Sequence, residues 1–323
     1  MDPVIFDVFG PIKLRWYGLG YLLAFVFGFL LLRWLAKKKL WVMGESKVAD
    51  FITYAAVFGV FLGGRIGYIL FYQIPKEGGW AELRNDPLMI FKVWDGGMAS
   101  HGGILGLVIF TYFYAKKHKV SWTGVGDGLC VVAPIGIGLV RLANFINGEL
   151  YGHVAEKVKW AMKFPETLRT NGNAEAAVAA GGELAPEMYD IPFEGNLNQV
   201  LSQRLSWLIE RSRDDERLLN RLGDFMQARH PSQLYEALLE GLVLFVILIA
   251  TRIKFPKLPH GVLTGMFFLF YAIFRIIVEI YRVPDRGQAF VFGLTKGQFY
   301  STFMIVGGIA FIAYALRNKE QTL

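Results

Sequence analysis

The chain has 323 residues, of which 54% are hydrophobic and 19% charged, and its formal net charge is +7. Soluble domains average about 45–50% apolar and about 25% charged residues, so this composition excludes a disordered chain and indicates an integral membrane protein. A single cysteine, Cys130, excludes an intramolecular disulfide, and the five histidines form no metal-binding motif. We therefore expect no metal or other cofactor.

Seven apolar segments are long enough to cross a hydrocarbon core about 30 Å thick, which takes about 20 residues each. They cover residues 15–36, 51–72, 99–115, 125–146, 233–251, 260–281 and 298–316. Basic clusters follow the first, third, fifth and seventh segments, which predicts that these connections lie in the cytoplasm and the N-terminus outside. We expect an all-α membrane protein with about seven transmembrane helices, and we expect no binding to nucleic acid, because basic stripes with interleaved aromatic residues are missing.

The predicted helices divide the chain into three parts. Residues 1–146 hold the first four spans, residues 147–232 form a domain outside the membrane, and residues 233–323 hold the last three spans. Within the outer domain, residues 172–187 are rich in alanine and glycine, which predicts a mobile stretch. Leucine and phenylalanine residues at helical spacing over 197–225 predict an amphipathic helix, which either guides the substrate or forms a solvated cap.

Glycines recur four residues apart in the second and third spans, where they predict close packing of helix backbones. They are Gly59, Gly63 and Gly67 in the second span, and Gly102 and Gly106 in the third. A phosphate-binding loop is excluded because no Gly-Lys-Ser/Thr ending follows them.

Ionisable residues inside the predicted spans are the main indication of function. A charge at bilayer depth costs about 3 kcal/mol or more, so each one kept there is a candidate for a functional site. They are Arg65, Arg141, Glu240, Arg275 and Glu279, with His101 and Glu149 at the edges of the spans. The predicted topology places the three arginines roughly 8–10 Å below the outer surface.

Two interpretations of this layer stay open. A structural network would pair Arg65 or Arg275 with Glu240 or Glu279. Alternatively, the guanidinium groups bind a phosphate, because their planar form matches phosphate oxygens bidentately. His101 is either a hydrogen-bonding residue at a helix start or a general base, since an imidazole exchanges protons near neutral pH.

Six blocks of sequence, in order along the chain, carry polar residues and glycines at distinctive spacings. They are Trp16-Tyr17-Gly18, Gly63-Gly64-Arg65-Ile-Gly67-Tyr68, Asp95-Gly96-Gly97-Met98 followed by His101-Gly102-Gly103, Arg141-Leu-Ala-Asn144-Phe-Ile-Asn147-Gly148-Glu149-Leu-Tyr151-Gly152, Arg229-His230-Pro231-Ser232-Gln233-Leu234-Tyr235-Glu236, and Tyr271 with Phe274-Arg275-Ile-Ile-Val-Glu279. Together they resemble the prolipoprotein diacylglyceryl transferase family over nearly the whole membrane part. Between Phe164 and Ala228 no such resemblance is found.

The resemblance implies transfer of the diacylglyceryl group of phosphatidylglycerol to the lipobox cysteine thiol of a bacterial prolipoprotein, forming a thioether and releasing glycerol phosphate. It also implies a bacterial cytoplasmic (inner) membrane, contact with membrane lipids, an N-terminus and an outer domain in the periplasm, and an active site facing the periplasmic leaflet. The catalytic residues implied are His101, Arg141, Tyr271 and Arg275; the phosphatidylglycerol-binding residues are Tyr17, Arg65, Arg141, Asn144, Glu149, Gly152 and Arg275.

The chemistry of these residue types fits that reaction. A thiol must lose its proton to attack carbon, and the departing phosphate gains charge that Arg141 and Arg275 would stabilise. His101 either takes the thiol proton or orients the headgroup while Arg275 and Tyr271 shape the surroundings of the thiol. The alternative function is a transporter of an anionic solute, which would place ionisable residues near the midplane between internal repeats. An intramembrane protease would need two aspartates or a Ser/His pair within the spans, where only Asp127 is found.

Overall fold

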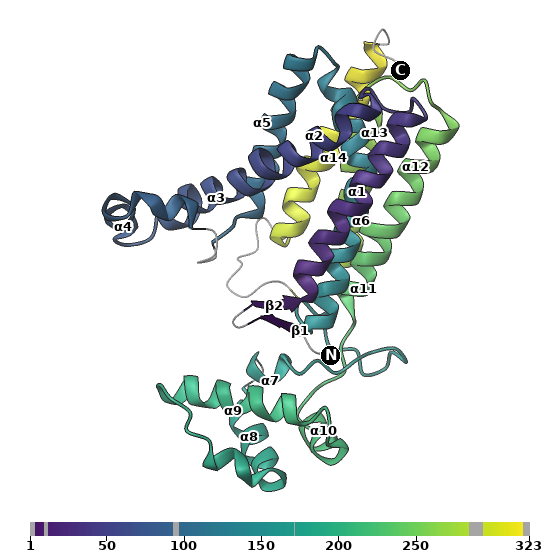
Figure 1. Cartoon of the computed structure of the whole chain (residues 1–323). Helices are drawn as coiled ribbons and strands as arrows, with labels where there is room; N and C mark the ends of the chain where they lie inside the picture. Colours follow the sequence, from purple (N-terminus) through teal and green to yellow (C-terminus); the bar gives the residue numbers. More distant parts are fainter. Residues whose placement is uncertain (1–3, 10–11, 93–96, 171, 284–292, 319–323) are drawn as a thin grey trace. The chain divides into compact units, whose positions relative to one another are not determined.

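Long helices make up most of the described part of the chain (Figure 1). The computed structural model describes residues 4–9, 12–92, 97–170, 172–283 and 293–318. These residues form two compact units. Unit 1 comprises Met1–Gly20, Gly138–Leu239 and Phe274–Ser301, whereas unit 2 comprises Tyr21–Ile137, Glu240–Ile273 and Thr302–Leu323.

Six helices in the described residues are long and apolar enough to cross a membrane, judged by length and composition. They are Trp16–Lys37 (α1), Glu45–Gln73, Trp122–Asn147 (α6), Ser232–Lys254, Val262–Glu279 (α13) and Lys296–Arg317 (α14). The third predicted span is also helical, as α5 (Ser100–His118), but a polar start and a Lys-Lys-His end lower its hydropathy. The helical membrane class is confirmed, while the number of seven spans and their orientation stay predictions.

Two of the long helices combine several shorter elements. Glu45–Gln73 contains η1 (Glu45–Lys47), α2 (Val48–Tyr54), η2 (Ala55–Phe61), α3 (Leu62–Tyr68) and η3 (Ile69–Gln73), followed by α4 (Gly79–Asn85) and η4 (Pro87–Phe91). Ser232–Lys254 contains α11 (Ser232–Glu236), η7 (Ala237–Val243) and α12 (Leu244–Lys254). Because η2, η3 and η7 are π-helical, the side chains after each of them point in a different direction from that of a regular α-helix.

A short β-hairpin precedes α1 and adds two strands to the predicted helical membrane fold. β1 (Val4–Phe9) pairs antiparallel with β2 (Ile12–Arg15), with Val4 opposite Arg15 and Phe9 opposite Ile12. The sequence of β1 is rich in β-branched and aromatic residue types, which favour extended backbone. The strands are too short to give a clear periodic signal beside the long apolar segment that follows them.

The predicted close packing of glycine-rich helices is confirmed inside unit 2, where α3 and η2 pack on α5. A Cβ atom added to Gly63 would lie 2.7 Å from the carbonyl oxygen of Gly102 and 2.8 Å from the Cα atom of Gly106. Any side chain at Gly63 would therefore force the two backbones apart, which is the reason for small residues at such contacts.

Asp127 of α6 holds the start of α13 in unit 2. Its buried carboxylate accepts hydrogen bonds from the backbone N–H groups of Gly261 and Thr264, at 2.9 and 2.8 Å, and from the Thr264 hydroxyl at 2.8 Å. The Arg252 guanidinium lies 3.4 Å from the same carboxylate. We call Asp127, Arg252, Gly261 and Thr264 the aspartate anchor.

The part of unit 1 between residues 147 and 232 contains a helical domain with its own core. It is built from α7 (Thr167–Thr170), α8 (Ala174–Leu184), η6 (Pro186–Asp190), α9 (Leu197–Arg211) and α10 (Glu216–Gly223). α8 packs on α9 and α10 (Figure 1). The core includes Leu168, Ala177, Met188, Leu205, Leu208, Leu218, Leu222 and Met226.

Two predictions about this domain are wrong. Residues 172–187 are not an unstructured stretch, because they contain α8, whose Ala177 and Gly181 are buried against the core. Small residues suit this packing, since a Cβ atom on Gly181 would lie 2.8 Å from a methyl carbon of Leu208. The single amphipathic helix is two helices, since the Asp215 carboxylate accepts from two backbone N–H groups and starts α10 anew.

Candidate active site

Three arginine side chains of unit 1 converge on one carboxylate. Glu236, the last residue of α11, is completely buried, and its Oε2 lies 3.2 Å from the Nε of Arg141. Its Oε1 lies 3.4 Å from Arg282 Nη1 and accepts a further hydrogen bond from Arg275 Nη1. Arg275 Nη2 also lies 2.9 Å from Glu279 Oε2. We call these five residues the arginine cluster.

The helices position this cluster through their periodicity. Arg275 and Glu279 are four residues apart on α13 and therefore share one face of the helix. Arg141 comes from the last part of α6, and Arg282 follows α13, where its backbone forms a β-bridge with Gly152. The pairing of Arg275 with Glu279, one of the alternatives that the sequence left open, is observed, and Glu236 contacts all three arginines.

The arginine cluster is suited to binding an anion. Arg141, Arg275 and Arg282 bring three guanidinium groups to one place, where all three contact Glu236 and Arg275 also contacts Glu279. The side chains of Arg141 and Arg275 are 18% and 13% exposed, whereas that of Glu236 is 0% exposed. An arriving anion can therefore reach the arginines while Glu236 stays covered, and guanidinium groups bind phosphate through paired hydrogen bonds.

A second polar network in unit 1 joins α1 to the end of α6. The hydroxyl of Tyr17 donates to Glu149 Oε1 at 3.1 Å and accepts a hydrogen bond from the Asn144 side chain. Asn147 Nδ2 donates to the same Glu149 oxygen at 2.9 Å. The structure thus brings together three of the predicted lipid-binding residues, Tyr17, Asn144 and Glu149. Their hydroxyl, amide and carboxylate groups suit the hydroxyls of a polar headgroup.

Gly152 is needed for the close approach of three chain segments in unit 1. A Cβ atom there would lie 2.7 Å from the Cβ of His230 and would also meet the carbonyl oxygen of Tyr281. The backbone N–H of Gly152 donates to the His230 carbonyl at 2.9 Å. A glycine is therefore required at position 152 for packing, and the close contact of these segments places Arg282 beside Glu236.

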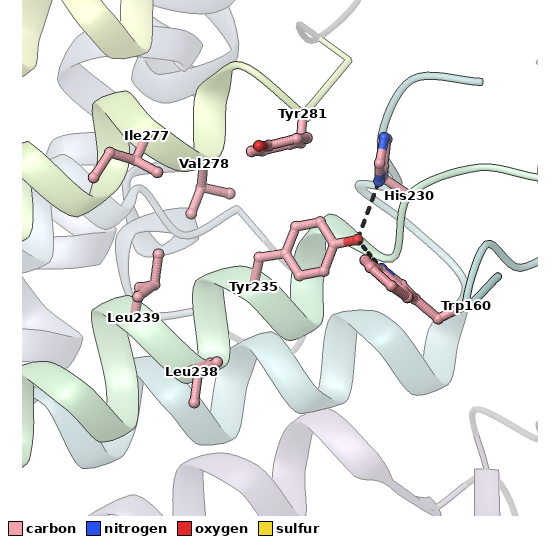
Figure 2. Close-up of a pocket in the computed structure, with 8 residues that line it drawn as sticks. All are labelled: Trp160, His230, Tyr235, Leu238, Leu239, Ile277, Val278 and Tyr281. Atoms are coloured by element: carbon pink, nitrogen blue, oxygen red, sulfur yellow. Dashed lines mark hydrogen bonds between the residues drawn. The ribbon is translucent and has the colours of Figure 1, made fainter. Parts of the chain in front are cut away.

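An open pocket of about 270 Å³ lies on another face of α11 and α13 in unit 1 (Figure 2). The Tyr235 hydroxyl accepts a hydrogen bond from Trp160 Nε1 at 2.7 Å and shares another with His230 Nδ1 at 3.1 Å. Figure 2 shows these polar groups at one end and aliphatic side chains at the other. The lining residues are Trp160, His230, Tyr235, Leu238, Leu239, Ile277, Val278 and Tyr281.

The other predicted site residues belong to unit 2. Arg65 is buried and donates to the carbonyl oxygens of Ile90 at 3.1 Å, Gly97 at 2.9 Å and Met89. These bonds indicate that Arg65 anchors the segment before α5. His101 is exposed in the first turn of α5, and the Tyr271 ring stacks on Phe267 with centroids 5.7 Å apart. Asp95 and Gly96, quoted above in the third sequence block, lie outside the described residues.

Sequence reasoning missed two members of the arginine cluster. Glu236 lies in the predicted span 233–251 and meets the criterion that selected Glu240, namely an ionisable side chain at membrane depth. That signal could have found it. Arg282 lies one residue beyond the predicted span 260–281, and no pattern in the sequence connects it with Glu236.

The helices and the arginine cluster define a multi-pass membrane protein with a polar, cationic site. A family model described as prolipoprotein diacylglyceryl transferase matches residues 3–314. Three similar proteins are named phosphatidylglycerol–prolipoprotein diacylglyceryl transferase. The one from Serratia proteamaculans is 39% identical over 324 residues, which cover 99% of this chain and 95% of the relative. Those from Erwinia tasmaniensis and Yersinia pestis are 38% identical over 323 residues and 37% identical over 326 residues, which cover 99% and 100% of this chain and 94% and 96% of the relatives. The chain belongs to the prolipoprotein diacylglyceryl transferase family. These findings do not support the alternative of an anion transporter.

Proposed function

We propose that the protein transfers the diacylglyceryl group of phosphatidylglycerol to the lipobox cysteine of prolipoproteins. The names of the relatives include both substrates. The observation that carries the proposal is the arginine cluster, in which the side chains of Arg141 and Arg275 are partly exposed and can meet an anion. Phosphatidylglycerol presents a phosphate at the bond that must break.

The reaction follows from this arrangement. The thiolate sulfur forms a bond to the glycerol carbon, the bond between that carbon and the phosphate oxygen breaks, and the electron pair leaves on glycerol phosphate. Negative charge grows on the phosphate as the bond breaks, and Arg141 and Arg275 stabilise it in surroundings of low dielectric constant. His101 is the proposed acceptor of the thiol proton, since a positioned imidazole is the commonest general base.

The remaining predicted residues take supporting roles in this proposal. Tyr17, Asn144 and Glu149 hold the hydroxyl groups of the headgroup, because their linked side chains present several hydrogen-bonding atoms. Tyr271 shapes the surroundings of the thiol. The packing of Gly152 against His230 and Tyr281 supports an indirect role, in which the glycine places Arg282 in the cluster.

The location of the protein is also part of the proposal. Membership of the family favours the bacterial cytoplasmic membrane, and the basic clusters favour an N-terminus and an active site on the periplasmic side and a C-terminus in the cytoplasm. A reporter that is active only in the cytoplasm should therefore be active when it is fused after Leu323. Activity only in the periplasm would contradict this orientation.

The test of the function uses the purified full-length protein in detergent. Incubation with phosphatidylglycerol labelled in its acyl chains and a peptide containing a lipobox should give a thioether-linked lipid and free glycerol phosphate. The same peptide with serine in place of the lipobox cysteine is the matched control and should stay unmodified. If correctly folded protein leaves the cysteine peptide unlabelled as well as the serine control, the proposed function is contradicted.

A further inference from the structure

We propose that Glu236 is a positioning residue that holds Arg141 and Arg275 in the geometry needed for phosphate departure. This inference rests on the proposed transfer reaction. It assigns a role to a residue that the sequence motifs alone did not select, and it starts from the convergence of three guanidinium groups on one buried carboxylate.

Burial separates the role of Glu236 from that of the arginines. The side chain of Glu236 is 0% exposed, so it has no surface with which to contact a lipid. The side chains of Arg141, Arg275 and Arg282 are 18%, 13% and 7% exposed. The carboxylate therefore lies beneath the guanidinium groups, and its effect on the substrate must pass through them.

Charge explains why this carboxylate is needed. Guanidinium groups of like charge repel one another, and the repulsion is strong where water is largely excluded. Glu236 has two oxygens and shares them among three arginines, Arg141 on Oε2 and Arg275 and Arg282 on Oε1. The shared carboxylate therefore holds three guanidinium groups together that would otherwise repel one another.

Glu279 provides an internal comparison. It carries the same charge and contacts Arg275 at 2.9 Å, but it also accepts a hydrogen bond from Thr295 at 2.8 Å. Glu279 forms an ion pair with Arg275, whereas Glu236 contacts three arginines from different segments of unit 1. If position rather than charge alone matters, loss of the Glu236 charge must be more harmful than loss of the Glu279 charge.

The changes in kcat and KM on substitution distinguish a positioning role from simple electrostatic attraction. Glu236→Gln keeps the shape of the side chain and removes a negative charge, which leaves the cluster more cationic. Simple attraction would then bind anionic phosphatidylglycerol more tightly. Misplaced guanidinium groups would instead lower the rate of the chemical step, where an error of about 1 Å costs about 100-fold.

The experiment measures kcat and KM for phosphatidylglycerol in detergent, together with the thermal midpoint of each protein. Glu236→Gln should lower kcat about 100-fold without raising KM. Glu236→Asp keeps the negative charge on a shorter side chain, further from the arginines, and should lower kcat by a smaller factor. Glu279→Gln should lower kcat less than Glu236→Gln. Glu166→Gln, which removes a carboxylate that pairs with Arg169 in the outer helical domain, should leave both constants unchanged.

Three results would overturn the inference: an unchanged kcat in folded Glu236→Gln, a raised KM with normal kcat, or loss of the fold in both Glu236 variants, which would make the residue structural. The wild-type protein keeps this test distinct from that of the function. Wild-type enzyme that forms no thioether-linked lipid contradicts the proposed reaction, whereas an active wild type with a fully active Glu236→Gln contradicts only the role of Glu236.

Discussion

The aspartate anchor and the arginine cluster are two ways to bury a carboxylate among helices. Asp127 receives three hydrogen bonds from Gly261 and Thr264 and faces a single guanidinium, that of Arg252. Glu236 faces three guanidinium groups instead. Asp127 and Arg252 are both nearly inaccessible, at 1% and 3% side-chain exposure.

This contrast shows how a structural ion pair can be distinguished from a functional one. In the aspartate anchor the charges balance and backbone N–H groups satisfy the carboxylate, so the arrangement gains nothing from a ligand. In the arginine cluster three guanidinium groups share Glu236, and the side chains of Arg141 and Arg275 remain partly exposed. We therefore expect substitutions in the anchor to change stability and substitutions in the cluster to change catalysis.

The largest effect should come from replacing a guanidinium of the cluster. Arg141→Lys and Arg275→Lys each keep the charge but lose the planar fork, so transfer should fall by about 100-fold or more, with loss in kcat as well as in lipid affinity. Arg252→Lys is the matched control in the anchor and should lower stability without lowering transfer per folded enzyme. Near-normal kcat in either cluster variant would show that charge alone suffices.

His101→Gln tests whether the base comes from outside the arginine cluster. Glutamine keeps a hydrogen-bonding side chain but cannot accept the thiol proton near neutral pH, so transfer should fall about 100-fold or more. Because the pKa of a free cysteine thiol is about 8.5, more of the thiol ionises without a base in alkaline buffer, and activity should recover partly there. A pH profile of the folded variant measures this recovery, and its absence would favour an orienting role for His101.

Asp127→Asn should break the aspartate anchor. The change leaves the buried Arg252 without its counter-charge and sets an amide group against backbone donors, which should cost about 3 kcal/mol of stability. Thermal unfolding in detergent measures the loss, and transfer per folded enzyme should stay normal. Asp50→Asn on the exposed face of α2 is the control and should leave the midpoint unchanged. A stable but inactive Asp127→Asn would place the anchor in the catalytic machinery.

The smallest effect concerns His260, which precedes α13 beside the anchor. Burial lowers the pKa of His260, and the charge of Arg252 lowers it further. The unfolded chain therefore binds the proton more readily, so this contribution to stability is complete above about pH 6.5 and is lost as the pH falls. Between pH 7.5 and pH 5 the thermal midpoint of the wild type should therefore fall further than that of His260→Gln. Parallel curves would contradict this assignment.

Local sequence patterns determined the membrane class, the approximate helix ends and the packing of Gly63 on Gly102, because each depends on residues close together in the chain. They also selected Arg141 and Arg275, since a charge in an apolar segment is conspicuous in any fold. Patterns failed in the helical domain between residues 147 and 232, where the alanine- and glycine-rich segment forms α8 and packs on α9 and α10.

Only the tertiary structure decided what surrounds each charge. Glu279 was among the predicted partners of Arg275, whereas the contacts of Arg275 and Arg282 with Glu236 became apparent only in the structure. It also assigned three carbonyl partners to Arg65, which the sequence had grouped with the phosphate-binding arginines. The physical reason is that an ion pair depends on distances of a few ångströms between segments far apart in the chain, and these distances follow from how the helices pack.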